Sequence, residues 1–180
     1  MKFFCCDYHE GAHPEIMRRM IETNMEQTVG YGEDEHCGRA RQLILEACQA
    51  SDADVHFLVG GTQTNATVIA AALRPYQGVI TADSGHINVH ETGAVEASGH
   101  KVLPQPSIEG KLTAAQIRAY AQWHKQNGAR EHIVMPKMVY ISNPTEYGTL
   151  YTKTELEAIS RVCREEDFYL YLDGARLGYG

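Results

Sequence analysis

Gly60, Gly61 and Thr62 form the first segment of this sequence whose residue types could bind an anion. They follow the short apolar run 55–59 and precede the alanine-rich stretch 64–73. Two glycines let the backbone approach a ligand closely, and the start of a helix offers free N–H groups at the positive end of its dipole. The segment has neither the Gly-Lys-Ser/Thr of a P-loop nor the spacing of dinucleotide sites. Taken alone, the segment is more consistent with a tight turn that has no ligand than with a phosphate site.

His86 is the second residue that could do chemistry, because it follows the short apolar run 79–80. Its flat ring could stack on another ring at the edge of a sheet, or it could form a local hydrogen bond at a helix start. His86 and His90 are four residues apart, which is metal-ligand spacing on a helix. Neighbouring residues supply no clear third ligand and the segment is not H-E-x-x-H. We therefore predict no metal site.

Asp173 and Glu146 are acids that follow apolar runs, 168–172 and 137–141 respectively. A carboxylate at the end of a buried strand is poorly solvated and needs a cationic partner. Arg176 could neutralise Asp173 in a purely structural pair. A protonated heterocyclic nitrogen, as in cofactors that act as electron sinks, is the functional alternative. Glu146 by itself indicates a turn with an exposed acid.

The elements that must position these residues alternate along the chain. Extended segments are expected at 55–59, 79–80, 101–103, 137–141 and 168–172. Helices are expected from Pro14 onward and at 39–49, 64–73, 87–97, 113–127 and 152–165. Strands that alternate with helices of this length favour βαβ units. We therefore predict an α/β fold with a mostly parallel sheet flanked by helices, and ligands at the carboxyl ends of the strands.

Composition and charge exclude several classes of function. The net charge of −7, from 16 basic and 23 acidic residues without a basic cluster, argues against nucleic-acid binding. No segment resembles a signal peptide or reaches the length of a membrane span, so we expect no membrane association. Five scattered cysteines without a C-x-x-C pair predict neither a disulfide framework nor a zinc site. A reducing, cytoplasmic environment is expected.

Five motifs together resemble the threonine aldolase and β-eliminating lyase family of fold-type I pyridoxal-phosphate enzymes. They are CDYHEGAHPEI near the start, YGED at 31–34, GGTQTN at 60–65, DSGHINVHETGA at 83–94 and LDGAR at 172–176. They occur in the family's order and span nearly the whole chain. The resemblance implies pyridoxal 5'-phosphate as cofactor, a small amino acid as substrate and a homodimer or homotetramer. It implies the cleavage of threonine to glycine and acetaldehyde.

The resemblance also implies a role for each matching residue. Gly61 and Thr62 would bind the cofactor phosphate at a helix N-terminus. His86 would stack on the pyridine ring. Asp173 would pair with the protonated ring nitrogen, and Arg176 would donate a hydrogen bond to the phenolic oxygen.

Three further residues take roles only from this resemblance. Cys6 stands where many members have a serine that contacts the substrate carboxylate, and Tyr31 lies on a loop that reaches a neighbouring subunit's site. Many threonine aldolases carry Asn-Thr-His where this sequence has 143–146, so Glu146 is expected to act beside His86 as the second catalytic residue. An aminotransferase, a β-eliminating amino acid lyase and a non-catalytic phosphate- or metal-binding domain remain alternatives.

The family's cofactor lysine bears on the expected domain content. That lysine follows LDGAR in a serine-lysine-glycine context, and the sequence ends at Gly180. The resemblance implies that residues 1–180 hold an N-terminal segment and most of the cofactor-binding large domain. The rest of the large domain and the small domain would be absent. The chain alone is therefore expected to lack lyase activity.

Overall fold

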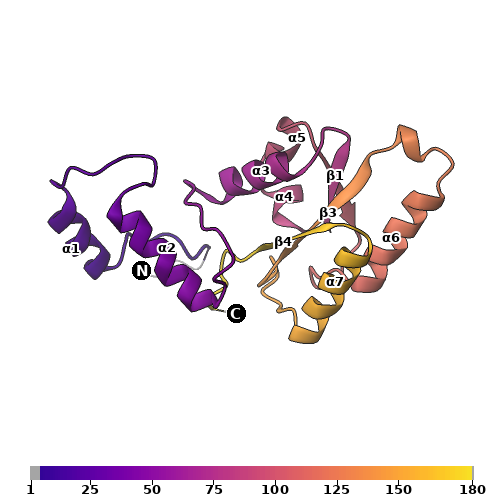
Figure 1. Cartoon of the computed structure of the whole chain (residues 1–180). Helices are drawn as coiled ribbons and strands as arrows, with labels where there is room; N and C mark the ends of the chain where they lie inside the picture. The colour runs from indigo at the N-terminus through magenta and orange to yellow at the C-terminus, as the bar shows by residue number, and fades with distance from the viewer. Residues whose placement is uncertain (1–4, 180) are drawn as a thin grey trace. The chain divides into compact units, whose positions relative to one another are not determined.

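The computed structural model describes residues 5–179 and separates the chain into two units, one up to Phe57 and one from Leu58 onward. The first unit contains α1 (Pro14–Thr23) and α2 (Glu35–Cys48) (Figure 1). Pro14 begins α1 as predicted, since the first turn of a helix does not need its missing N–H. The second helix begins earlier than predicted because Asp34 caps it, accepting a hydrogen bond from the Cys37 N–H at 2.9 Å.

A parallel sheet forms the centre of the second unit. Its strands are β1 (Gln77–Ala82), β2 (Lys101–Gln105), β3 (Met135–Ser142) and β4 (Tyr169–Asp173). They lie in the order β2-β1-β3-β4, and each neighbouring pair is parallel. The predicted α/β class with a mostly parallel sheet is therefore confirmed. The parallel arrangement brings the carboxyl ends of all these strands to one edge.

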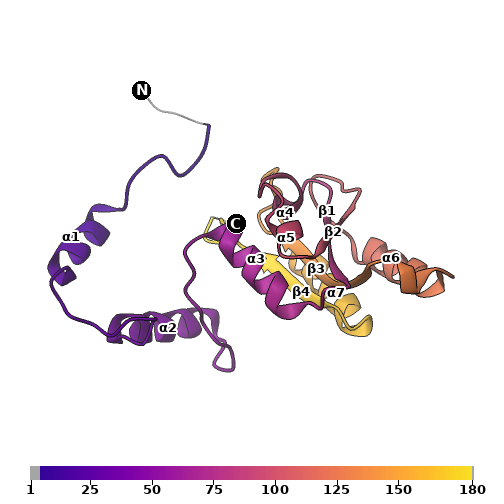
Figure 2. The ribbon, with the colours of Figure 1, turned by 90° about the horizontal axis from the view of Figure 1, so that it is seen from above.

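Helices cover both faces of this sheet (Figures 1 and 2). They are α3 (Gly61–Ala72), α4 (His86–Val89), α5 (Ala94–Ala97), α6 (Ala114–Gln126) and α7 (Lys153–Glu165). Successive strand residues point to opposite faces, so Val79 packs with α3, α4 and α5 whereas Ile80 packs with α6 and α7. Burial on both faces explains why the central strands β1 and β3 contain continuous apolar runs.

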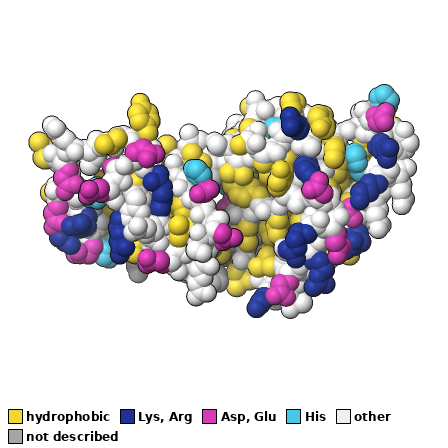
Figure 3. All heavy atoms as spheres, in the orientation of Figure 1, with side chains coloured by type: hydrophobic (Ala, Val, Ile, Leu, Met, Phe, Trp, Pro, Cys, Tyr) yellow, Lys and Arg dark blue, Asp and Glu magenta, His cyan; other side chains and the backbone are white. Residues whose placement is uncertain are grey.

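The outer surfaces of α6 and α7 are charged. Figure 3 shows Lys, Arg, Asp and Glu side chains gathered over these two helices. Arg118 of α6 pairs with Glu165 of α7, and Lys125 pairs with Glu166 just after α7 at 2.5 Å. An exposed pair such as Arg118 with Glu165 contributes little stability, so the apolar inner faces hold these helices in place.

Two predicted elements are wrong. Residues 55–59 form no strand, because a strand needs a neighbour for its N–H and C=O groups and no strand of the described residues pairs with them. The single helix predicted at 87–97 is two short helices, α4 and α5. Between these two helices, Thr92 has a φ angle of 55° and Gly93 a φ angle of 73°. This left-handed backbone conformation ends the first helix.

Ile80 is expected to report on the packing of the sheet against α6 and α7, because its side chain is fully buried at the centre of β1. Replacing Ile80 with valine removes one methyl group and should lower the free energy of unfolding by about 1 kcal/mol. Urea denaturation would measure the change. Ile108→Val is the matched control, since Ile108 is 81% exposed and its substitution should change stability little.

Candidate functional site

The acids and histidines singled out by the sequence gather where the strands end. His86 follows β1, Glu146 follows β3, and Asp173 is the last residue of β4. Since the strands are parallel, these positions share one edge of the sheet, which is where ligands of open α/β folds bind. The helix α3 contributes to the same edge through Asn65, whose side chain contacts Asp173 at 3.3 Å.

Asp173 is held by three hydrogen bonds. Its Oδ2 accepts from the Tyr140 hydroxyl at 2.5 Å and from the Asn65 amide at 3.3 Å. Its Oδ1 accepts from the backbone N–H of Ala175 at 3.0 Å. Burial, and then the hydrogen bond to Asp173, raise the pKa of Tyr140 well above its ordinary value. The tyrosine therefore stays protonated and donates, which fixes the carboxylate at the end of β4.

The structure brings His86 and Glu146 together. The backbone N–H of His86 donates to Glu146 Oε1 at 2.8 Å, and the hydroxyl of Ser142 donates to the same oxygen at 2.6 Å. The His86 ring is anchored elsewhere, because its Nδ1 lies 2.8 Å from Glu91 Oε1. The ring itself is 44% exposed, so one nitrogen is fixed while much of the ring surface stays open.

The sequence patterns did not single out Asn65, Glu91, Tyr140 or Tyr171, although they complete this site. Asn65 donates to Glu91 Oε1 at 2.6 Å and accepts from the Tyr171 hydroxyl at 2.6 Å. Asn65 and Glu91 lie within the motifs GGTQTN and DSGHINVHETGA, but these motifs gave no sign of the contacts that the two side chains make. Asn65 lies in the alanine-rich helix, and both it and Glu91 are buried.

The first turn of α3 is open in the way that the phosphate hypothesis requires. Gly60 precedes the helix and makes no side-chain capping hydrogen bond. A Cβ added at Gly60 or Gly61 would meet no atom within 4 Å, so the backbone there can be approached closely. Thr62 is exposed beside it. No described contact tests the phosphate role, which stays a prediction.

A cleft of about 450 Å³ lies beside Glu146. Its lining comprises Asp83, Ser84, Val89, His90, Ser107, Glu146 and Tyr147. The hydrogen bond from Ser107 lowers the pKa of Asp83, so this acid carries its charge at neutral pH. The buried oxygens Ser84 Oγ and Glu146 Oε2 have no hydrogen-bond partner among residues 5–179. Ser84 and Glu146 line the cleft, although these two oxygen atoms are themselves enclosed by protein atoms.

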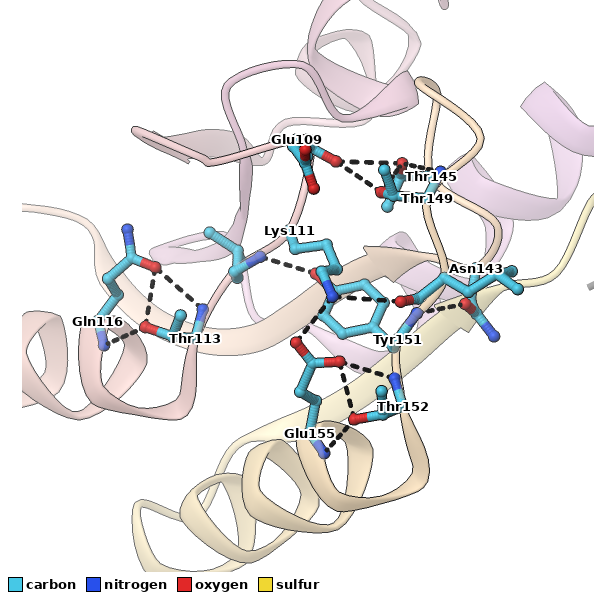
Figure 4. A network of polar contacts seen from close by, with 12 residues as sticks. Glu109, Lys111, Thr113, Gln116, Asn143, Thr145, Thr149, Tyr151, Thr152 and Glu155 are labelled. Carbon is cyan, nitrogen blue, oxygen red and sulfur yellow. Dashed lines mark hydrogen bonds and ion pairs between the residues drawn. The ribbon is translucent and has the colours of Figure 1, made fainter.

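The loop that carries Glu146 is pinned independently of any ligand (Figure 4). Asn143 Oδ1 accepts from the backbone N–H of Tyr151 at 3.0 Å, which closes the base of the loop. Thr149 donates to the backbone carbonyl of Glu109 at 2.7 Å, which ties the loop to the segment after β2. These contacts place the Glu146 carboxylate without help from a bound molecule.

Lys111 and Glu155 support the same loop (Figure 4). Lys111 Nζ donates to the Leu150 carbonyl at 3.2 Å and to Glu155 Oε1 at 2.7 Å. Glu155 also completes a capping box at the start of α7: its carboxylate accepts from Thr152, and the Thr152 hydroxyl accepts from the Glu155 N–H. The hydrogen bond from Lys111, followed by those from Thr152, lowers the pKa of Glu155 from 4.5 to about 2.

This lowered pKa predicts a loss of stability in acid. A carboxylate whose folded-state pKa is depressed contributes stability above its unfolded value, 4.5, and that contribution is lost as the pH falls towards about 2. Glu155→Gln should therefore flatten the corresponding part of the curve of unfolding free energy against pH. Urea denaturation at several pH values checks this. Glu157→Gln, on the same helix and largely solvated, is the control; identical curves for both variants would contradict the expectation.

The remaining predicted site residues lie in the turn after β4 or in the first unit. Arg176 lies in the exposed turn after β4. Cys6 and Tyr31 belong to the first unit, where Tyr31 is fully exposed with φ of 64°. Among residues 5–179, no three His, Cys, Asp or Glu side chains group so as to hold a metal ion. No helix of that range is long and apolar enough to cross a membrane.

Known proteins resemble this chain over nearly its whole length. The low specificity L-threonine aldolase of Pseudomonas aeruginosa is 34% identical over 175 residues, which cover 96% of this chain and 49% of that protein. The threonine aldolase structure of Leishmania major is 53% identical with a TM-score of 0.89, and covers 94% of this chain and 48% of that one. The fold is shared with the PLP-bound C-S lyase of Staphylococcus hominis. That structure is 10% identical, with a TM-score of 0.57, and the match covers 89% of this chain and 40% of that one.

These comparisons bear on both fold and family. The chain spans about half the length of the curated relatives it matches. Its parallel sheet and flanking helices are those of fold-type I enzymes, as the sequence motifs implied. The family model described as beta-eliminating lyase matches residues 4–178. Because that match covers almost every residue, the chain belongs to the beta-eliminating lyase family.

Proposed function

We propose that this chain forms the cofactor cradle of a pyridoxal-phosphate lyase that cleaves threonine, or a related β-hydroxy-α-amino acid, to glycine and an aldehyde. The observation that carries the proposal is the hydrogen-bond network at the sheet edge, in which Asn65 joins Asp173 to Glu91 and thereby to His86. The threonine aldolases among its relatives support the choice of substrate.

The residues present fit this cofactor. Its phosphate needs an anion site, and the uncapped start of α3 with open space at Gly61 offers one. Its aromatic ring needs a flat partner, which the exposed ring of His86 supplies. Its protonated nitrogen needs an acid, and the Asp173 carboxylate lies at the end of β4. These three features support the proposed cofactor site.

Each residue then has a defined task when the cofactor is bound. Pyridoxal phosphate supplies an electron sink for the electrons of the broken Cα–Cβ bond. Gly61 and Thr62 bind the phosphate through the backbone N–H groups and the hydroxyl of the first turn. His86 covers one face of the ring. Asp173 accepts a hydrogen bond from the ring N–H and keeps it protonated, and Arg176 donates to the phenolic oxygen.

Glu146 takes the proton of the substrate β-hydroxyl on its Oε2. Among the described residues that buried oxygen has no hydrogen-bond partner, while Oε1 is held by His86 and Ser142, so a side-chain movement that uncovers Oε2 would leave it as the free acceptor. Cys6 contacts the substrate carboxylate. Tyr31 reaches the site of a neighbouring subunit in a cytoplasmic homodimer or homotetramer. Residues 1–180 supply the N-terminal segment and most of the large domain.

A substrate panel tests the proposed function in the protein expressed from the complete reading frame that contains this chain. Incubation with threonine should yield equimolar glycine and acetaldehyde, and allo-threonine should be tested alongside. Pyruvate or another keto acid as the product would instead identify a β-eliminating lyase or an aminotransferase. Absence of a cofactor absorbance band in that protein after addition of pyridoxal phosphate would contradict the proposal altogether.

A further inference from the structure

Glu91 is an acid in an unusual position. Its side chain is completely buried, although moving a carboxylate out of water costs several kcal/mol unless hydrogen bonds compensate. One oxygen, Oε1, receives both the His86 Nδ1 contact at 2.8 Å and the Asn65 amide at 2.6 Å. An apolar side chain would fill the same space at lower cost. The carboxylate therefore points to a task beyond packing.

Asn65 orients the Glu91 carboxylate. Burial raises the pKa of Tyr171 to about 12, so its hydroxyl stays protonated and donates to Asn65 Oδ1 at 2.6 Å. The amide nitrogen of Asn65 must then face the two acids, Glu91 and Asp173, and it donates to both. A single buried amide thus sets the positions of both carboxylates relative to α3.

We infer that Glu91, oriented by Asn65, is a positioning residue for His86. A carboxylate only accepts hydrogen bonds, so the contact to Nδ1 holds the His86 ring in the form that carries its proton on Nδ1. The same contact anchors a ring that is 44% exposed and would otherwise change rotamer freely. The benefit of a fixed ring rests on the proposed function, in which that ring lies on the cofactor. The proton position itself is a property of this chain without any ligand.

Nitrogen NMR of the 180-residue chain with ¹⁵N-labelled histidine rings tests this inference without cofactor. In the unmodified chain the His86 signals, assigned by their loss in His86→Gln, should show a protonated Nδ1 and a bare Nε2. Glu91→Met should shift the proton largely to Nε2, whereas Glu91→Gln should retain it on Nδ1 because the amide oxygen still accepts. If Glu91 served packing alone, methionine would be the milder replacement. If Glu91 positions His86, glutamine is the milder one, so the two roles predict opposite orders of effect for the two variants.

Two internal controls make the result specific. His100 is buried with its Nδ1 3.2 Å from the backbone carbonyl of Gln77, so its signals should not respond to changes at Glu91. Glu96→Met removes an exposed acid a few residues away and should leave His86 unchanged. A His86 proton on Nε2 in the unmodified chain would overturn the inference even where Glu91→Met failed to fold.

Cofactor binding supplies a second readout and separates the two proposals. Glu91→Met should weaken the affinity for pyridoxal phosphate by about 10-fold, by analogy with the loss of metal affinity when the hydrogen-bond partner of a metal-binding histidine is removed. Lack of cofactor binding by the protein from the complete reading frame would defeat the proposed function and leave the NMR result standing. Unchanged affinity in Glu91→Met together with an unmoved His86 proton would overturn the positioning role alone.

Discussion

Replacing Glu146 with glutamine is expected to slow threonine cleavage by about 10²- to 10⁴-fold, the usual contribution of a general base. The amide oxygen of glutamine can still accept from the His86 N–H and from Ser142, so the loop and the ring next to it should keep their positions. What the variant loses is an oxygen that can take a proton. The expected signature is a lower kcat with an unchanged affinity for the cofactor.

The comparison is made in the protein from the complete reading frame, with glycine formation as the assay. Glu109→Gln is the matched control, because Glu109 holds the same loop through its backbone carbonyl while its side chain is exposed. That variant removes the same charge from the same region and should keep nearly full activity. Full activity in Glu146→Gln as well would exclude this carboxylate as the base.

Replacing Asp173 with asparagine should weaken cofactor binding by about 30-fold to several thousand-fold. Removing one partner of a buried hydrogen-bonded charge pair costs about 2–5 kcal/mol, and each 1.4 kcal/mol is a factor of ten. Asparagine can still accept from Tyr140, but it has no negative charge to balance a protonated ring nitrogen. Equilibrium dialysis with pyridoxal phosphate measures the dissociation constant directly.

Asp167→Asn serves as the control for that substitution. Asp167 precedes β4, at the end of the strand remote from the site, and its side chain is 95% exposed beside Lys137. Its loss should leave cofactor affinity unchanged. Equal affinities for Asp173→Asn and the unmodified protein would mean that the ring nitrogen has no acid partner at this position.

The strands and long helices could be predicted because their signals are local. Apolar runs mark β1 and β3 because both faces of these central strands are buried, and a run of the same kind marks β4. Thr152 with Glu155 marks the start of α7. Residues 55–59 carry the same apolar signal without forming a strand. Pairing depends on a partner elsewhere in the chain, which no local pattern reveals.

The same distinction between local and non-local signals applies to the site residues. His86, Glu146 and Asp173 could be found because they follow strands, where parallel topology gathers side chains. Asn65 and Glu91 could not be assigned roles, because their contacts join residues 26 positions apart in the chain and depend on the packing of α3 against the sheet. Their polarity within buried segments was visible, but the partners that explain it were not.

The parallel order of the sheet also shapes how this protein must fold. β1 pairs directly with β3, and Gln77 lies opposite Met135, so all of β2 and α6 must be made before the central pair of strands can close. In such non-local pairing, the entropy cost of closing a long loop comes before the stabilising contacts form. Folding is therefore slower than that of a helical bundle of similar size. During synthesis on the ribosome, β1 emerges well before β3. Its apolar side chains remain exposed until β3 is available to pair with it. Chaperone dependence during synthesis is therefore expected to track the delay between these two strands.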